Sequence, residues 1–204
     1  MLRHRPLLGL AAVLMIISLG ATGVRAEPSD PAAARIEALD HGLLESMKAG
    51  ATMSARARYK TLAPLIEASF DLPLMTRSAV GPTWTGMTES EHEALVSAFT
   101  RLSAASYAHN FNRFGGERFD IDATVETRGA DKIVQSHLIA PHGAPVALTY
   151  RMRQTPAGWK IVDVYYGAIS QLTTRRSDFA APLAAGGAKG LVAHLDALTD
   201  TLLK

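Results

Sequence analysis

The sequence predicts an α+β fold in which helices cover one face of a curved antiparallel sheet of about four strands. Helical periodicity runs from residue 32 to about residue 114, strand-like segments follow between residues 118 and 166, and helical periodicity returns near the C-terminus. Short turn signals separate the strand-like segments, which favours antiparallel hairpins. A curved sheet with helices on one face leaves a cone-shaped space between the two layers. This cone is either filled by side chains or open to a ligand.

The first residues have the pattern of a Sec-type secretory signal peptide. Arg3 and Arg5 precede an apolar run over residues 7–19, and the site Val24-Arg25-Ala26 has small residues at its −3 and −1 positions. We therefore expect a signal peptide over residues 1–26, with cleavage after Ala26, and a single domain over residues 27–204. An uncleaved anchor is the alternative, although the apolar run is shorter than the roughly 20 residues that span a bilayer.

The charge of the mature chain argues against a nucleic-acid partner. The full sequence has 21 Lys and Arg residues against 19 Asp and Glu residues, but Arg3, Arg5 and Arg25 precede the expected cut and no acidic residue does. The mature chain thus has 18 basic and 19 acidic residues, a net charge of −1, which removes the basic footprint of nucleic-acid binding. The sequence has no cysteine, which excludes a lipoprotein, disulfides, cysteine-ligated metals and thiol nucleophiles.

Helical segments precede the expected sheet. Residues 32–49 and 53–70 each have an apolar stripe at helical spacing, and Pro64 predicts either a kink or two short helices in the second segment. Residues 71–81 predict a short helix or turn with an apolar face. Thr88 and Glu91 have the spacing of a capping box, which predicts the start of a helix that runs to about Phe114.

The expected strands cover about residues 118–127, 132–140, 145–153 and 159–166. In the third strand, one predicted face carries Val146, Leu148, Tyr150 and Met152, and the other carries Thr149, Arg151 and Arg153. Beyond the sheet, Ser177 is a possible N-cap of a short helix that ends near Ala184, and Gly186-Gly187 predicts a turn. The last helix has leucines at helical spacing, Leu191, Leu195, Leu198 and Leu202.

No set of residues in the sequence has the pattern of a catalytic site or a cofactor site. It has no glycine-rich phosphate loop and no HExxH motif, and its histidines lack metal-ligand spacing. Asp163, in an apolar strand, could act as a base of raised pKa, or it could accept hydrogen bonds from a loop or pair with Arg175. Arg175 and Arg176 could bind a lipid phosphate or an acidic partner, or pair with Asp163 or Asp178.

Several short motifs carry a family resemblance between about Leu62 and Leu195. They are Phe70-Asp71-Leu72-Pro73, Gly81 with Trp84, Phe99-Thr100-Arg101-Leu102, Tyr107, Phe111, Gly116-Glu117-Arg118-Phe119, Tyr150-Arg151-Met152, Trp159-Lys160-Ile161-Val162-Asp163-Val164, Ser170 and Arg175-Arg176-Ser177-Asp178-Phe179. In their order and spacing the chain resembles the periplasmic phospholipid-binding carriers of the toluene-tolerance or MlaC family, and within it the hopanoid-associated HpnM branch.

The resemblance implies an NTF2-like fold around a deep apolar pocket. It also implies a periplasmic, non-enzymatic and cofactor-free carrier, expected to be a monomer, that moves lipid between an outer-membrane complex and an inner-membrane ABC transporter. Central family members usually have a Tyr-Arg pair where this chain has Arg175-Arg176, which favours the hopanoid branch and leaves phospholipid and hopanoid both open as ligands.

The carrier hypothesis predicts an apolar lining for the pocket. The residues expected to bind lipid are Leu74, Val80, Trp84, Phe99, Tyr107, Phe111, Leu148, Tyr150, Trp159 and Ile161. Two rival hypotheses use the same cone. One is a small-molecule isomerase or dehydratase, with Asp163 and Tyr150 as its acid–base pair. The other is a non-catalytic interaction module whose cone is filled by its own side chains.

Overall fold

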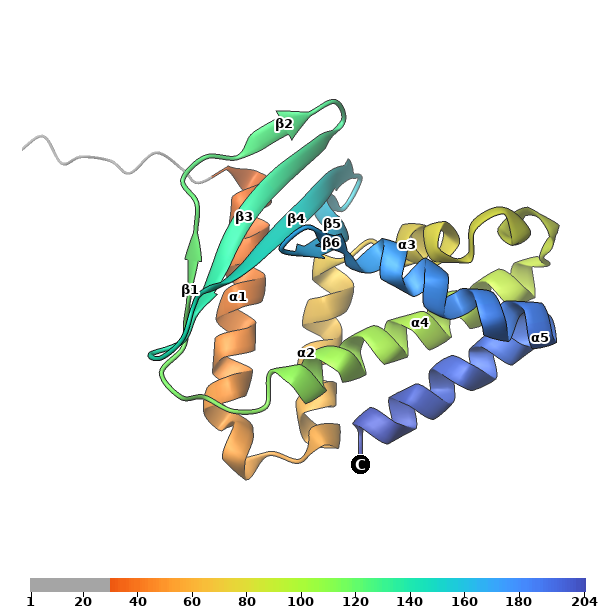
Figure 1. The fold of residues 1–204 in the computed structure, drawn as a ribbon, viewed down its shortest axis with the longest axis horizontal. Helices are drawn as coiled ribbons and strands as arrows, with labels where there is room; N and C mark the ends of the chain where they lie inside the picture. The colour runs from red at the N-terminus through yellow and green to blue at the C-terminus, as the bar shows by residue number, and fades with distance from the viewer. Residues whose placement is uncertain (1–29) are drawn as a thin grey trace, which may run out of the picture.

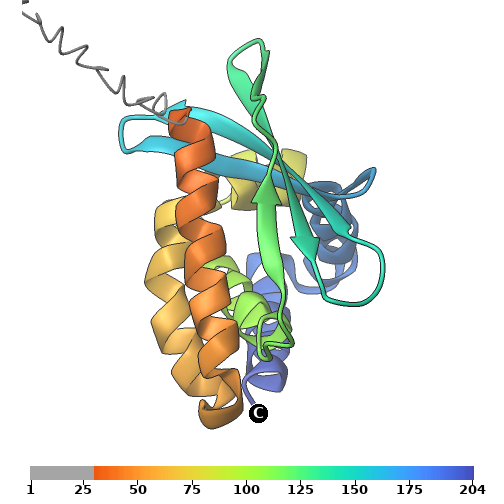
Figure 2. The same ribbon diagram turned by 90° about the vertical axis from the view of Figure 1, so that its left-hand side faces the viewer.

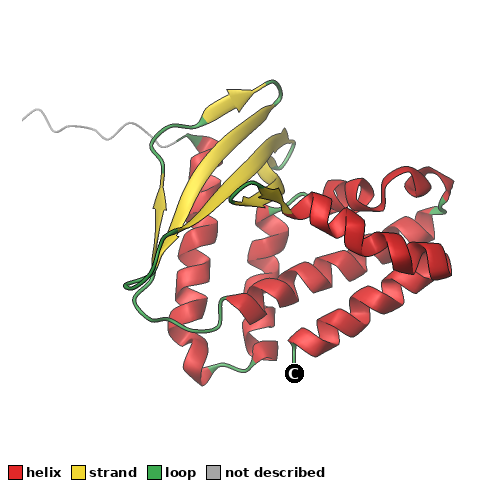
Figure 3. Cartoon of the chain, in the orientation of Figure 1, coloured by secondary structure: helices red, strands yellow, loops and turns green. Residues whose placement is uncertain are grey.

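The computed structural model describes residues 30–204, so the predicted signal peptide lies outside the described residues. One antiparallel sheet packs against a layer of helices, with the C-terminal helix on the far side of the central helix α4 (Figures 1 and 3). Helices α1 and α2 run side by side, as Figure 2 shows from the end of the molecule. Among residues 30–204, no helix is both long and apolar enough to cross a membrane.

The segments before the sheet are α-helices joined by short 3-10 turns. They are α1 (Pro31–Ala49), η1 (Gly50–Thr52), α2 (Ala55–Ser69), α3 (Leu72–Val80), η2 (Gly81–Gly86) and α4 (Glu89–Asn110). Helix α2 is a single helix that contains Pro64. The capping box is confirmed, because the Thr88 hydroxyl accepts from the backbone N–H of Glu91, and the Glu91 carboxylate accepts from the N–H of Thr88 at 2.8 Å.

Helix α4 ends earlier than the sequence predicts. Its last residue is Asn110, and Phe111 has left the helical conformation with φ −102° and ψ 60°. The amide of Asn112 donates to the carbonyl of His109, which satisfies a terminal acceptor that a longer helix would have used itself. Phe114, the residue at which the sequence predicts the helix to end, is therefore exposed, while Phe111 stays buried.

Within residues 30–204 the sheet has six strands, so the expected count of about four is wrong. The strands are β1 (Arg118–Ile121), β2 (Glu126–Arg128), β3 (Asp131–Ile139), β4 (Val146–Thr155), β5 (Gly158–Tyr166) and β6 (Ile169–Ser170). Their order is β1-β3-β4-β5-β6, and β2 pairs with β3. The expected strand over residues 118–127 is split, because the chain leaves the ladder after Ile121 and returns at Glu126 beside another part of β3.

The predicted two faces of β4 are largely confirmed. Leu148, Tyr150 and Met152 are buried in the same hydrophobic core as the helices, and Arg151 and Arg153 on the other face are partly exposed. Val146 is the exception, since it is 45% exposed at the start of the strand. The helices thus cover one face of the antiparallel sheet, which makes this a mixed helix and antiparallel-sheet fold.

Helix α5 (Gln171–Leu202) begins before the predicted site, and Ser177 is not its N-cap. Ser170 caps it, accepting from the backbone N–H of Thr173 at 3.0 Å, whereas Ser177 lies inside the helix. The predicted turn is confirmed, because Gly187 has φ 58° and ψ −150° and divides α5 into two halves. The chain reverses there, so the second half runs back along α4 (Figure 1).

Candidate functional site

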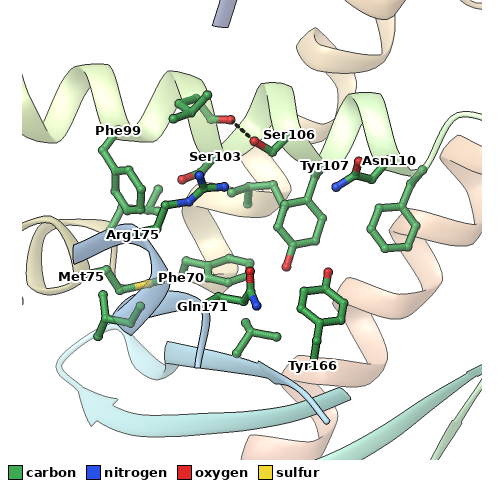
Figure 4. A pocket seen from close by; sticks show the side chains of 16 residues that line it. Phe70, Met75, Phe99, Ser103, Ser106, Tyr107, Asn110, Tyr166, Gln171 and Arg175 are labelled. Carbon is green, nitrogen blue, oxygen red and sulfur yellow. Dashed lines mark hydrogen bonds between the residues drawn. The ribbon is translucent and has the colours of Figure 1, made fainter. Parts of the chain in front are cut away.

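A cavity of about 120 Å³ lies where α2, α3 and α4 meet β5 and the start of α5. Its lining residues are Ile66, Phe70, Leu72, Met75, Phe99, Leu102, Ser103, Ser106, Tyr107, Asn110, Phe111, Val164, Tyr166, Gln171, Leu172 and Arg175 (Figure 4). Most of these side chains are apolar, and the polar ones come mainly from α4 and α5.

Aromatic rings form much of the apolar wall. The ring centroids of Phe70 and Tyr107 are 5.5 Å apart, and Tyr107 stacks on Phe111 at 5.6 Å. Phe99 meets Phe179 edge-on at 5.7 Å, which holds the first half of α5 against α4. Such aromatic pairs add packing free energy beyond the area they bury, so this wall is well defined.

The corner between α2 and α3 holds Phe70 in place. The backbone N–H of Asp71 donates to the carbonyl of Ile161 on β5 at 2.9 Å, and the Asp71 carboxylate caps α3 by accepting from the N–H of Leu74. This local geometry joins α2, α3 and β5 at one end of the cavity.

The polar side of the cavity gathers residues from both helices. Ser103, Ser106 and Asn110 lie at helical spacing on α4, and Gln171 and Arg175 lie one turn apart on α5. The Ser106 hydroxyl donates to the carbonyl of Leu102 at 2.8 Å, as the dashed line in Figure 4 marks.

Two phenolic hydroxyls, those of Tyr107 and Tyr166, point toward one another across the cavity (Figure 4). Burial raises the pKa of the Tyr166 hydroxyl, and it raises the pKa of the Tyr107 hydroxyl well above its usual value. Both phenols are therefore neutral at physiological pH, and they give the cavity hydrogen-bonding capacity without charge.

Asp163 accepts hydrogen bonds from the loop beside it, which is one of the three alternatives that the sequence left open. Its carboxylate accepts from the Ser170 hydroxyl at 2.7 Å and from the backbone N–H of Leu172 at 3.0 Å. These bonds fix the first turn of α5, and hence the position of Gln171 and Arg175 on the cavity wall.

The acid–base pair of the enzyme hypothesis is not brought together. Tyr150 pairs with Val164 and faces the helices, whereas Asp163 pairs with Arg151. Since residues that pair directly across a sheet share a face and neighbours in a strand alternate, Asp163 and Tyr150 lie on opposite faces. In the described part of the chain, no three His, Asp or Glu side chains are placed to hold a metal ion.

The two arginines at the start of α5 have different surroundings. Arg175 lines the cavity and lies 3.4 Å from the carboxylate of Asp178 on the same helix. The guanidinium of Arg176 lies beside Gly81 instead, about 3.4 Å from where a β-carbon would stand. Of the pairings that the sequence left open, the one between Arg175 and Asp178 is found.

The structure brings three of the ten predicted lipid-binding residues, Phe99, Tyr107 and Phe111, to the cavity. Leu74 and Trp84 line a separate surface groove between α3, η2 and α4. Trp159 lies under the ammonium group of Lys132, 4.8 Å from the ring centroid. The remaining four are buried core residues, namely Val80, Leu148, Tyr150 and Ile161.

Most of the polar residues that line the cavity were not predicted from the sequence. Ser106 and Asn110 follow Ser103 at helical spacing beside the aromatic stripe of α4, so this pattern could have been read from the sequence. Gln171 gave no such signal, because the start of its helix was expected at Ser177.

The chain matches the family model described as MlaC protein over residues 37–197. Among solved structures, it is similar to a protein from Ralstonia solanacearum described as a phospholipid-binding protein in complex with a phospholipid. The two chains are 23% identical with a TM-score of 0.73, and the match covers 85% of this chain and 99% of that one. This likeness supports the fold, and a search of the curated proteins found no match. Since the family model covers most of its length, the chain belongs to the MlaC family.

Proposed function

We propose that the protein is a lipid carrier that holds acyl chains among the aromatic side chains of the cavity. The observation that carries this proposal is the cavity itself, with an apolar wall from α2, α3 and α4 and its polar side chains gathered on α4 and α5. The similar Ralstonia solanacearum protein was solved with a phospholipid. Each methylene removed from water contributes roughly 0.8 kcal/mol, so apolar walls alone supply strong binding of long chains.

Binding requires that the walls of the cavity move apart. Its volume of about 120 Å³ is below the roughly 300–1,000 Å³ of ligand pockets in proteins. The first half of α5 is the wall we expect to move, since Gly187 breaks the helix at its far end. Its first turn stays fixed by the hydrogen bonds of Asp163, so the motion is a rotation about that turn. In this proposal, the structure shows the pocket in its narrow form, before the walls have moved apart.

The rest of the proposal extends to transport. Residues 27–204 form one NTF2-like carrier domain, exported by the signal peptide and working as a monomer in the periplasm. It exchanges lipid with an inner-membrane ABC transporter and an outer-membrane complex. The export pattern of residues 1–26 and membership of the MlaC family support this assignment. The Arg175-Arg176 pair supports the HpnM branch, for which a hopanoid-type lipid is the alternative ligand.

Native mass spectrometry of the mature protein, purified without detergent, tests the carrier function. We expect a bound lipid in stoichiometric amount, which extraction then identifies. The variant Ser103→Phe adds a ring to the cavity wall and should lower lipid retention, whereas Ala94→Phe adds the same ring to the exposed side of α4. A wild-type protein that stays free of lipid after incubation with membranes would contradict the proposal.

A further inference from the structure

Two neighbouring hairpins form an uncharged, exposed surface at one end of the sheet. The β3–β4 hairpin contributes residues 144–147 and the β5–β6 hairpin contributes residues 166–169, and every residue of both segments is exposed. The sequence has no Asp, Glu, Lys or Arg between residues 133 and 150 or between residues 164 and 174. We call residues 144–147 and 166–169 together the uncharged platform.

The two halves of the uncharged platform lie side by side. The backbone N–H of Gly167 donates to the carbonyl of Ala147 at 3.3 Å, and both hairpins lie at the right of Figure 2. Tyr166 pairs with Leu148 on one neighbouring strand and with Ile169 on the other. Because residues paired across strands share a face of the sheet, Tyr166 and Ile169 lie on the same face as the buried Leu148.

Large apolar side chains are concentrated on the uncharged platform. Val146, Tyr166 and Ile169 are 45%, 41% and 65% exposed, and they are three of the five large hydrophobic side chains that are exposed among residues 30–204. Val146 precedes Leu148 by two residues, so it lies on the same face as the other two. Single exposed hydrophobic residues are common on protein surfaces, whereas a contiguous patch marks an interaction site.

The uncharged platform continues the wall of the cavity outward. Tyr166 belongs to both, since it also lines the cavity, where its hydroxyl points toward that of Tyr107 (Figure 4). A lipid that leaves the cavity past Tyr166 therefore reaches an exposed apolar surface without a charged side chain of its own. Whatever covers this surface is in position to exchange lipid with the cavity.

The charges at the margin of the uncharged platform suit a lipid surface. Arg118 is exposed and lies opposite Ile139 at the foot of the first hairpin, and Arg175 follows the second hairpin. Glu117, beside Arg118, accepts a hydrogen bond from a backbone N–H of its own loop, and Asp163 is buried and accepts two hydrogen bonds. An apolar centre with basic residues at its margin is complementary to a bilayer surface, where anionic phosphates surround an apolar interior.

We propose that the uncharged platform docks the carrier on a lipid bilayer, with Val146, Tyr166 and Ile169 inserted among the headgroups. This inference rests on the proposed carrier function and adds a membrane-contact surface to it. Tyrosine suits such a position, because its ring is apolar and its hydroxyl can bond to water or headgroups. Three side chains make a small contact, so the attachment is reversible, as a carrier that must leave the bilayer requires.

Fluorescence from a single labelled cysteine tests the docking surface, because the sequence has no cysteine of its own. Ala168→Cys in the mature protein is labelled with the environment-sensitive fluorophore NBD and titrated with vesicles of phosphatidylethanolamine and phosphatidylglycerol. We expect a blue shift and stronger emission as the label enters the bilayer interface. The same label on Thr127→Cys, exposed on β2 beside the other end of β3, should report no change.

Aspartate substitutions on the uncharged platform measure what its apolar side chains contribute. Ile169→Asp in the Ala168→Cys protein should weaken vesicle binding roughly 10-fold or more, because a carboxylate cannot replace the apolar contact. Val146→Asp should act similarly, since both hairpins belong to one surface. Thr127→Asp is the matched control, which adds the same charge away from the platform and should leave binding unchanged. Thermal unfolding checks the fold, which we expect to be intact because all three positions are exposed.

A second measurement separates docking from lipid binding. Wild type and Ile169→Asp are each loaded with phospholipid from detergent, the detergent is removed, and native mass spectrometry counts the bound lipid. We expect equal lipid content, because Ile169 does not line the cavity, but slower uptake from vesicles by the variant. A wild type that holds no lipid after loading would overturn the carrier function, and this inference with it.

Three results would overturn the docking surface and leave lipid binding intact. The first is an NBD spectrum at residue 168 that vesicles do not change, which would assign the uncharged platform to a protein partner. The second is an Ile169→Asp variant that binds vesicles as tightly as wild type does. The third is a blue shift that appears without vesicles as the protein concentration rises, which would mean that a second copy of the chain covers the platform.

Discussion

The hydroxyl of Ser136 on β3 donates a 3.0 Å hydrogen bond to Oδ2 of Asp40 on α1. The other oxygen of this carboxyl group, Oδ1, is buried with no hydrogen-bond partner among the described residues, and Asp40 is only 3% exposed. Burial raises the pKa of Asp40 from 3.8 to about 7, although the hydrogen bond from Ser136 partly offsets the shift. A carboxyl group in this place is therefore more stable as the neutral acid.

Asp40 should make the stability of the protein depend on pH between about 4 and 7. In this window the folded state keeps a proton that the unfolded state has released, so the free energy of unfolding falls as the pH rises. The neutral form contributes fully below pH 3.8, and that contribution is lost above about pH 7. Between pH 5 and pH 7 the loss should be roughly 2–3 kcal/mol.

Urea unfolding of wild type and Asp40→Asn at several pH values between 5 and 8 measures this dependence. The amide cannot ionise, so the variant should show a much flatter profile and exceed the wild type in stability at pH 8. Asp200→Asn, at an exposed position, should follow the wild-type profile. Parallel profiles for wild type and Asp40→Asn would mean that Asp40 titrates normally.

Arg58 should be important for stability because it joins three backbone segments. It is 7% exposed, and its guanidinium donates to the carbonyls of Ala108 at 2.9 Å, Gly50 at 3.1 Å and Met53 at 2.6 Å. Arg58→Ala leaves these acceptors without their donor and opens a cavity, so we expect a loss of roughly 3 kcal/mol or more. Chemical denaturation measures this loss of stability. The control is Arg56→Ala, on the exposed side of α2, which should change stability by less than about 0.5 kcal/mol.

The sequence predicted those parts of the fold that depend on local chemistry. The capping box of Thr88 and Glu91 sets the start of α4, and Gly187 sets the break in α5, because each acts on the backbone within its own turn of the chain. The start of α5 depends instead on a contact between segments, since Asp163 on β5 holds Ser170 and the N–H of Leu172. Periodicity carries no sign of such a contact, so the sequence predicts the N-cap at Ser177 and not at Ser170.

The candidate site was harder to predict for a related reason. Strand alternation correctly assigned Leu148 and Tyr150 to the face that the helices cover, but residues of the core and residues of a cavity wall share that face. Whether a residue belongs to the core or to a cavity wall depends on how closely the helices approach the sheet. The spacing of residues in the sequence does not show this. The stripe of α4 was more informative, because Phe99, Tyr107 and Phe111 all reach the cavity.

Asp163 should affect lipid retention through the position of α5, without any catalytic role. Asp163→Ala removes the acceptor for the Ser170 hydroxyl and the N–H of Leu172, and it should destabilise the fold by about 2 kcal/mol. Because Arg175 follows Leu172 by one turn, the variant should also retain less phospholipid than wild type in native mass spectrometry. Asp178→Ala, on the exposed side of the same helix half, serves as the control for stability. Full lipid retention by a folded Asp163→Ala variant would show that the hydrogen bonds of Asp163 do not position the cavity wall.

The two adjacent glycines of α5 should respond in opposite directions to alanine. Gly187 has φ 58° and ψ −150°, a region that L-residues with a β-carbon rarely adopt, so Gly187→Ala should destabilise the protein by about 1–3 kcal/mol. Gly186 has no positive φ and lies in helical structure with open space around an added β-carbon. Gly186→Ala should therefore raise stability by up to about 1 kcal/mol, since alanine favours helix and restricts the unfolded chain. Thermal unfolding of the two variants beside wild type measures the difference, and a loss of stability in both would mean that the break in α5 involves Gly186 as well.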